Sequence, residues 1–161
     1  MLENITNLVK QYAGDAIINN PSIPNDRNDE AVSDASNSIV NGLKGAVSGG
    51  NLGGITDFFK GGEQAAASSP VTQNMQAGFV QNLVQKFGLD HGKASHIASA
   101  LIPMVISKLV SKTNDPNDKS FDLSSIVGSL AGGGGIGDMM KNLGGGDDKD
   151  GGIMGKLKNM F

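Results

Sequence analysis

The longest run with helical periodicity in this chain lies between residues 82 and 133. Apolar residues recur in it at spacings of three and four, which places them on one face of an α-helix. An apolar stripe of this length must be buried against other elements, so we expect the rest of the chain to pack around it. Its residues are Ala94, Ile97, Ala98, Leu101, Val105 and Leu109.

The same periodicity recurs along the chain, and no stretch alternates with period two among β-branched or aromatic residues, so the sequence predicts an all-α fold. Ser69 followed by Pro70, and Asp90, are typical helix starts, and Gly88 is a typical helix end. The predicted helices cover residues 2–20, a segment from Asn25 or Asn28 to Gly49, 51–60, 70–87, a central helix starting at Leu89–Asp90 that contains Pro103, and a segment from Ser120 or Asp122 to about residue 131.

The length of 161 residues fits one domain with a tail. We expect a helical domain over residues 1–131, in which the small and polar segment 63–69 (EQAAASS) is a linker. Residues 132–161 are rich in glycine, and we expect them to be a tail with short helices and an amphipathic C-terminal segment. The domain and the tail are therefore expected to have separate roles.

An internal repeat divides the expected domain into units 1–62 and 70–131. NLVKQYAGD at 7–15 matches NLVQKFGLD at 82–90, and each match is followed by a long helix, a short helix and a pair of glycines. Chance alignment of amphipathic helices is the alternative, but three segments in the same order favour duplication. The sequence thus predicts two similar three-helix units that pack face to face.

Several segments of the chain resemble the bacterial YidB-like proteins, the family called domain of unknown function 937. They are GDAIINNPSIPN, GLKGAVSGGNLGGI, QNMQAGFVQNLVQKFGLD and ALIPMVISKLVSKTNDPNDKSFDLSSIVGSL, of which the run with SKTNDPND is the most specific. The resemblance covers residues 1 to about 131. It implies a multihelical cytoplasmic fold of uncharacterised role and transfers no catalytic residue.

The composition argues against several classes of protein. A net charge of −3, a single Tyr and no Trp are atypical of a nucleic-acid binder. Without cysteine there is no disulfide framework, thiolate ligand or cysteine nucleophile. The N-terminus lacks the pattern of a secretory signal, and no run of about 18 apolar residues is present. We expect a cytoplasmic protein without a cofactor.

Two groups of residues could be mistaken for sites of chemistry. His91 and His96 are five residues apart, so they cannot share a helical face as metal ligands. The oxygen-rich turn near residue 115 lacks the EF-hand order, because Lys119 and Ser120 stand where a ligand and the glycine would fall. We therefore expect a turn followed by a helix cap, and no metal or catalytic site, at Asn114, Asp115, Asn117, Asp118 and Asp122.

The C-terminal segment has an apolar face bordered by Lys156 and Lys158. Such a face can pack on its own domain, dock into a groove of another subunit or lie on a membrane surface, the last being disfavoured by its shortness. The residues of this face, our candidates for self-association, are Ile153, Met154, Leu157, Met160 and Phe161.

These observations favour a non-catalytic protein that self-associates through its tail into a homo-oligomer or filament. The alternative is a monomeric adaptor that takes a partner helix or an apolar ligand between its two units. An enzyme ranks third.

Overall fold

The computed structural model describes residues 2–48 and 52–130. All regular secondary structure in these two ranges is helical, which confirms the all-α prediction. The tail 132–161, with its candidate residues for self-association, and the expected helix end at Gly49 lie outside the described residues.

The expected first helix is two elements. The α-helix α1 (Leu2–Tyr12) gives way to a π-helical turn, η1 (Gly14–Ile18). In this turn Ile18 N donates to Ala13 O at 3.0 Å and Asn19 N donates to Gly14 O at 2.7 Å, each five residues back. The wider turn still buries Ala13 and Ile17 completely. Packing of these two residues into the core therefore continues beyond the end of the α-helix.

The second long helix, α2 (Asn28–Ser48), follows a short 3-10 turn, η2 (Asn25–Arg27). Of the two starts that the sequence allows, Asn25 begins η2 and Asn28 begins α2, and the Oδ1 atom of Asn28 is buried without a hydrogen-bond partner in the described part of the chain. The start of α2 is fixed by the turn that precedes it.

Residues 63–67 of the segment predicted as a linker are helical, so the linker prediction is wrong for them. After α3 (Leu52–Lys60), α4 (Glu63–Ala67) packs against α6 with Ala66 only 1% exposed. Thr72 Oγ1 donates to Ala66 O at 2.6 Å, and Glu63 accepts from Ser107 Oγ at 2.8 Å. Small residues looked like linker composition, but alanine has the highest helix propensity and permits close packing.

The predicted caps of α5 (Pro70–Phe87) and α6 (His91–Asn114) are confirmed. Ser69 Oγ accepts from Thr72 N at 3.2 Å, and the Asp90 carboxylate accepts from Lys93 N at 3.1 Å. Gly88 ends α5 in the left-handed region with φ of 66°, where residues with a Cβ are strained.

The central helix α6 is the one that the sequence singled out. Every residue of its predicted stripe is buried, together with Ile102, Ile106 and Val110. It contacts α5, α4, α1 and α3. By length and composition α6 could also cross a membrane, but half of the relevant window is buried inside the bundle, as expected for a core helix.

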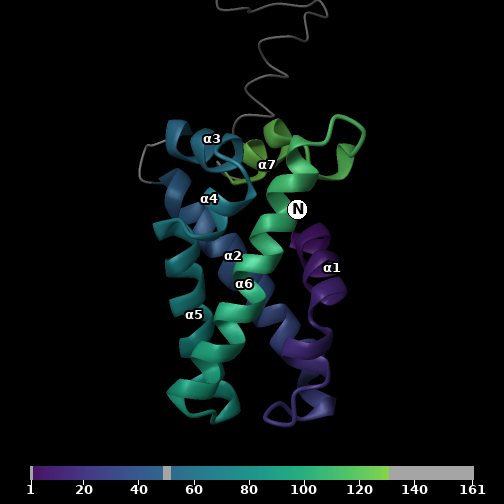
Figure 1. Ribbon diagram of the computed structural model, residues 1–161, viewed down its shortest axis with the longest axis vertical. Helices are drawn as coiled ribbons and strands as arrows, with labels where there is room; N and C mark the ends of the chain where they lie inside the picture. Colours follow the sequence, from purple (N-terminus) through teal and green to yellow (C-terminus); the bar gives the residue numbers. More distant parts are fainter. Residues whose placement is uncertain (1, 49–51, 131–161) are drawn as a thin grey trace, which may run out of the picture.

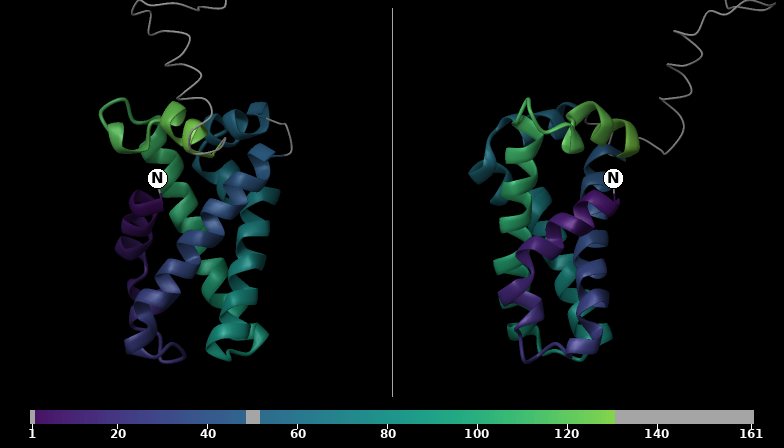
Figure 2. Two further views of the ribbon diagram at one scale, coloured as in Figure 1. Left: turned by 180° about the vertical axis from the view of Figure 1, so that it is seen from behind. Right: turned by 90° about the vertical axis from the view of Figure 1, so that its right-hand side faces the viewer.

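The helices α1, α2, α5 and α6 form an antiparallel bundle (Figures 1 and 2). α2 and α6 each pack against both α1 and α5. The short helices α3 and α7 (Leu123–Leu130) lie together at one end, and the α1–α2 and α5–α6 connections lie at the other. The buried residues form one hydrophobic cluster.

The two predicted units run in the same direction in this bundle (Figure 1). Some residues matched by the repeat are buried in both copies, as for Leu8 and Leu83, whereas Val9 is buried and its match Val84 is half-buried. The units differ in one connection, since residues 13–27 join α1 to α2, whereas residues 88–90 join α5 to α6. Common burial agrees with the repeat, while duplication itself stays a prediction.

Candidate functional site

A groove runs between the π-helical turn η1 and the first half of α6, and we call it the η1–α6 groove. It has a volume of about 440 Å³, within the range of ligand-binding clefts. It lies between the two units, because η1 follows α1 and α6 belongs to the second unit. Its lining residues are Gln11, Tyr12, Gly14, Asp15, Ala16, Asn20, His96, Ile97, Ala100 and Met104.

The groove is a consequence of the longer connection in the first unit. Gly88–Asp90 turns directly from α5 into α6, whereas the first unit inserts η1 and η2 between its long helices. Isolated π-helical turns are frequent at functional sites. A Cβ added at Gly14 would meet no atom within 4 Å, so the backbone of η1 borders open space there. The segment that breaks the repeat is therefore also the segment that lines the groove.

Apolar side chains make up much of the groove surface. Met104 is 46% exposed, one of the few large apolar side chains exposed to this degree in the described chain. Tyr12 and Ala16 are half-buried on the opposite wall, and Ile97 is buried beneath them. Methionine is flexible and polarizable, and it adapts to partners of different shape. Such a surface suits an apolar segment better than a rigid polar ligand.

Among the lining residues only Asp15 is an acid, and none is Lys or Arg. Its carboxylate accepts a 3.4 Å hydrogen bond from Asn19 Nδ2 and is exposed. His96, also exposed, lies on α6 in the same groove. The groove thus combines apolar walls with one negative charge, which favours a ligand that is apolar and carries a cation.

Two further grooves flank α5 and share Gln81. One, of about 490 Å³, lies between α5 and α6, and the other, of about 600 Å³, lies between α2 and α5. Neither is lined by Asp, Glu, Lys or Arg, and the groove between α2 and α5 is about half polar, whereas the groove between α5 and α6 is mostly apolar. These grooves lack both the acid and the exposed methionine of the η1–α6 groove.

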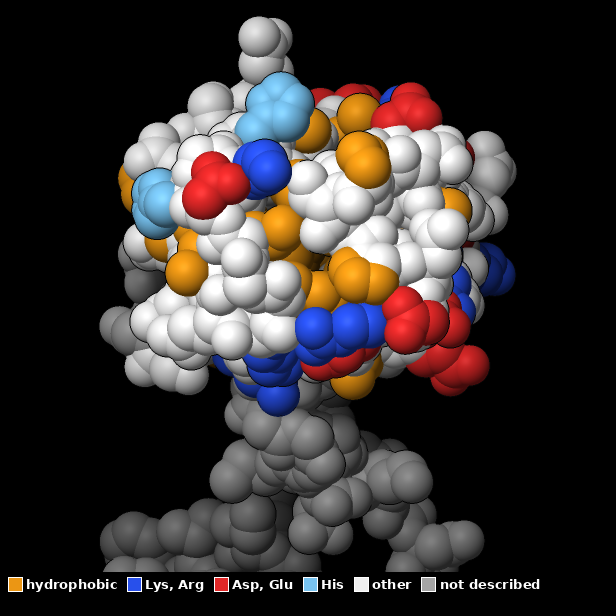
Figure 3. All heavy atoms as spheres, turned by 90° about the horizontal axis from the view of Figure 1, so that it is seen from below, with side chains coloured by type: hydrophobic (Ala, Val, Ile, Leu, Met, Phe, Trp, Pro, Cys, Tyr) orange, Lys and Arg blue, Asp and Glu red, His pale blue; other side chains and the backbone are white. Residues whose placement is uncertain are grey.

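Apolar side chains also reach the surface at the end of the bundle that carries the helix connections. Figure 3 shows this end, with apolar groups surrounded by charged side chains of both signs. Ile18, in η1, is 43% exposed. A small hollow lined by Ile18 and Pro24 borders Asn20, which also lines the η1–α6 groove. This hollow is mostly polar, so the exposed Ile18 side chain is separated from the apolar walls of the η1–α6 groove.

The side chains of the oxygen-rich turn expected from the sequence form hydrogen bonds with other groups of the chain. Asn114 Nδ2 donates to Phe59 O at 2.9 Å and so ties the end of α6 to α3. Asp115 Oδ1 accepts from Asn117 N at 2.8 Å. Asp118 accepts from Ser120 N at 3.0 Å and from Lys112 Nζ at 3.2 Å, and these bonds hold the pKa of Asp118 below its usual value.

Asp122 caps α7. Its carboxylate accepts from the hydroxyl of Ser124 and, at 3.1 Å, from Ser125 N, and these bonds lower the pKa of Asp122. Within residues 2–48 and 52–130, no group of three or more His, Cys, Asp or Glu side chains is placed to hold a metal ion. In the described chain the side chains of the turn form hydrogen bonds with backbone groups near the end of α6 and the start of α7.

The two histidines lie in different places. His91 lines the groove between α5 and α6, with Nδ1 3.3 Å from Ser95 Oγ, whereas His96 lines the η1–α6 groove. Sequence reasoning separated them correctly by their helical spacing. It missed the groove itself, although an apolar Met104 outside the predicted stripe and the unequal connections in the two units could have indicated it.

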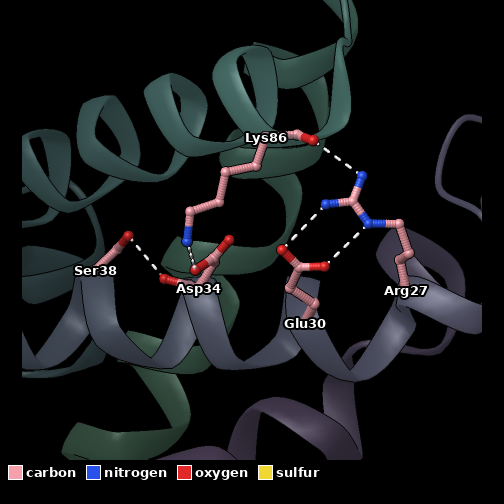
Figure 4. Close-up of polar contacts among 5 residues, drawn as sticks. All are labelled: Arg27, Glu30, Asp34, Ser38 and Lys86. Carbon is pink, nitrogen blue, oxygen red and sulfur yellow. Dashed lines mark hydrogen bonds and ion pairs between the residues drawn. The ribbon is translucent and has the colours of Figure 1, made fainter.

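A polar cluster missed by the sequence reasoning joins α2 to the end of α5 (Figure 4). Arg27 donates to both carboxylate oxygens of Glu30 at 3.0 Å and to Lys86 O at 2.9 Å, and its guanidinium lies 4.2 Å from the ring centroid of Phe87. The bond to Glu30 raises the pKa of Arg27 and lowers the pKa of Glu30. With the Lys86–Asp34 pair, the cluster fixes how the two units meet.

Compared with models of protein families, with curated proteins and with solved structures, the chain matches none of them. The resemblance to the YidB-like family therefore stays a prediction.

Proposed function

We propose that this protein is a non-catalytic cytoplasmic protein that associates with further copies of itself through its C-terminal segment. The observation that carries the proposal is the η1–α6 groove, an open and partly apolar surface on a bundle whose core is already filled by its own helices. The apolar residues Ile153, Leu157 and Met160 of the tail supply the other surface of the proposed contact between copies.

The shape of the bundle supports a repeating contact. The described chain ends with α7, at the end of the bundle where α3 lies, whereas the residues that line the groove lie toward the opposite end (Figures 1 and 2). A contact between a tail and a distant groove is heterologous, and such contacts produce rings or filaments. If the protein self-associates in this way, its weight-average mass should increase with concentration.

Deleting residues 144–161 tests the proposal. The full chain should show a weight-average mass that rises with concentration in sedimentation equilibrium, and the deleted chain should remain a monomer. Circular dichroism checks that the helical domain is retained. If the deletion leaves the mass distribution unchanged, the tail does not mediate association and the proposal fails.

The same groove supports a second candidate, a monomeric adaptor that takes a partner helix or an apolar ligand between its units. Helix-in-groove recognition uses surfaces of this kind. A full chain that stays monomeric at all concentrations, and that captures one different protein through Met104, would favour the adaptor.

A further inference from the structure

We infer that the η1–α6 groove of one copy is the receptor for residues 153–161 of a second copy. This inference rests on the proposed function and names the surface that receives the tail. The occupant is a segment of known sequence, so its apolar face, charge and length can each be compared with the groove.

The apolar surfaces are complementary in kind. The tail segment offers Ile153, Leu157 and Met160 within a narrow arc if it binds as a helix. The groove offers the exposed side chain of Met104 and the half-buried Tyr12. Methionine on both surfaces allows the contact to adjust without a rigid fit. Burying Met104 would also remove a large exposed apolar group from water.

The lengths agree. As a helix, residues 153–161 would extend about 13 Å at a rise of about 1.5 Å per residue. The part of α6 that lines the groove, from His96 to Met104, also has nine residues and rises about 13 Å by the same measure. The segment can therefore contact the whole wall formed by α6 without extending far beyond it.

The charges also agree. Asp15 is the one acid in the lining, and no Lys or Arg accompanies it. Lys156 and Lys158 border the apolar face of the tail segment. A cation that docks beside Asp15 gains Coulomb energy, and because this carboxylate is exposed the gain is modest and is screened by salt. The two grooves beside α5 offer no carboxylate to these lysines.

The position of the groove in the bundle favours a tail that comes from a second copy. Leu130 ends α7 near α3, while the groove lies toward the end with the helix connections. To reach its own groove the chain would have to return along the bundle, whereas a neighbour stacked end to end presents its groove directly. Residues 131–152 are long enough for either route, at up to about 70 Å when extended. The experiment must therefore separate the two routes.

Two full-length variants make this separation when they are compared with the unaltered chain, which stays monomeric if the tail docks in its own groove and gains mass with concentration if the tail docks in a second copy. The groove variant Asp15→Lys/Met104→Lys keeps its tail, and the tail variant Leu157→Ser/Met160→Ser/Phe161→Ser keeps its groove. Each should be monomeric alone in sedimentation velocity, because each lacks one half of the contact. Mixed together they should form a 1:1 complex, since the intact tail of one meets the intact groove of the other. Unchanged circular dichroism shows that both variants are folded.

Charge exchange tests the contact at residue level. Asp15→Lys alone should weaken association at least about tenfold, and adding Lys156→Glu/Lys158→Glu should restore most of the loss. Gln81→Lys, exposed on α5 in the two other grooves, is the matched control and should leave association unchanged.

The outcomes distinguish the inference from the proposed function. If the tail variant is monomeric but the groove variant assembles like the unaltered chain, the receptor lies elsewhere and only the inference fails. If the tail variant assembles fully, the proposed function fails as well. If the unaltered chain is monomeric and the mixed variants form no complex, docking between copies is overturned.

Discussion

The Nζ atom of Lys86 lies 2.7 Å from Oδ1 of Asp34 and joins the last turn of α5 to α2. The Asp34 side chain is 7% exposed, whereas Lys86 is 48% exposed. Asp34 Oδ2 is buried and accepts no hydrogen bond within the described residues. The pair thus places one incompletely solvated carboxylate between the units, and Lys86 is the cation that offsets its burial.

Lys86→Met should lower the free energy of unfolding by about 1–3 kcal/mol, because it leaves the Asp34 carboxylate buried without its partner. Asp34→Leu combined with Lys86→Met should recover much of the loss, since no buried charge remains. Urea denaturation measures both, with Lys44→Met, at an exposed site on α2, as the control. Equal effects of Lys86→Met and Lys44→Met would show that the pair contributes nothing.

Gly42 sets the distance between α2 and α5. A Cβ at this position would overlap the side chain of Met75, whereas one at Gly45, a few residues along α2, would meet no atom within 4 Å. Gly42→Val should therefore cost about 1–3 kcal/mol of stability through overpacking. Gly45→Ala should be neutral or stabilising by up to about 1 kcal/mol. Thermal unfolding of the two variants checks the contrast, and similar melting temperatures would contradict it.

The burial of α4 gives a prediction for two adjacent alanines. Ala66→Glu should destabilise the protein by about 3 kcal/mol or more, because it forces a carboxylate against α6. Ala65→Glu, on the exposed side of the same helix, should change stability by less than about 0.5 kcal/mol. Both variants replace an alanine of the same helix with glutamate, so the change in helix propensity is the same. Similar values from urea titrations would mean that segment 63–69 is a linker after all.

Acid should destabilise the fold below about pH 4.5, the range in which carboxylates of the unfolded chain take up protons. A hydrogen bond from Ser107 lowers the pKa of Glu63, and bonds from Ser124 and Ser125 lower the pKa of Asp122. A lowered folded-state pKa means that the folded form binds fewer protons, so its stability is present above the unfolded pKa and is lost as the pH falls.

Melting temperatures between pH 7 and pH 3 test this dependence. Asp122→Asn should melt lower than the unaltered protein at pH 7 and lose less on acidification, because the titrating cap is gone. Asp57→Asn, at an exposed carboxylate on α3, serves as the control. A variant Asp122→Asn that retains the full acid dependence would contradict the assignment.

Features set by neighbouring residues could be predicted from the sequence. Asp90 and Ser69 cap their helices through amides three residues on, and Gly88 adopts the left-handed conformation directly after α5, so each depends on local geometry alone. The stripe of α6 was predictable for the same reason, because helical periodicity identifies the buried face before its partners are known. The acidic turn was predictable in kind, since its residue types favour turns and caps.

The candidate site was less accessible to prediction. The sequence predicts one helix over residues 2–20, whereas in the structure α1 ends at Tyr12, which is half-buried on the wall of a groove, and η1 follows. Met104 lies outside the predicted stripe of α6. The groove exists because α1 packs beside α6, a contact between segments distant in sequence whose position no local pattern specifies.

The sequence by itself determined that the chain is helical, where α5 and α6 begin, and which face of α6 is buried, because each follows from periodicity or from bonds within one turn. Only the tertiary structure decided that residues 63–67 form a packed helix, that Lys86 meets Asp34, and that η1 and α6 enclose a groove. In each case the decisive energy comes from surfaces that meet only after folding. Ala66 is buried by α6, Asp34 is desolvated by α5, and Met104 is left exposed because no described helix covers it.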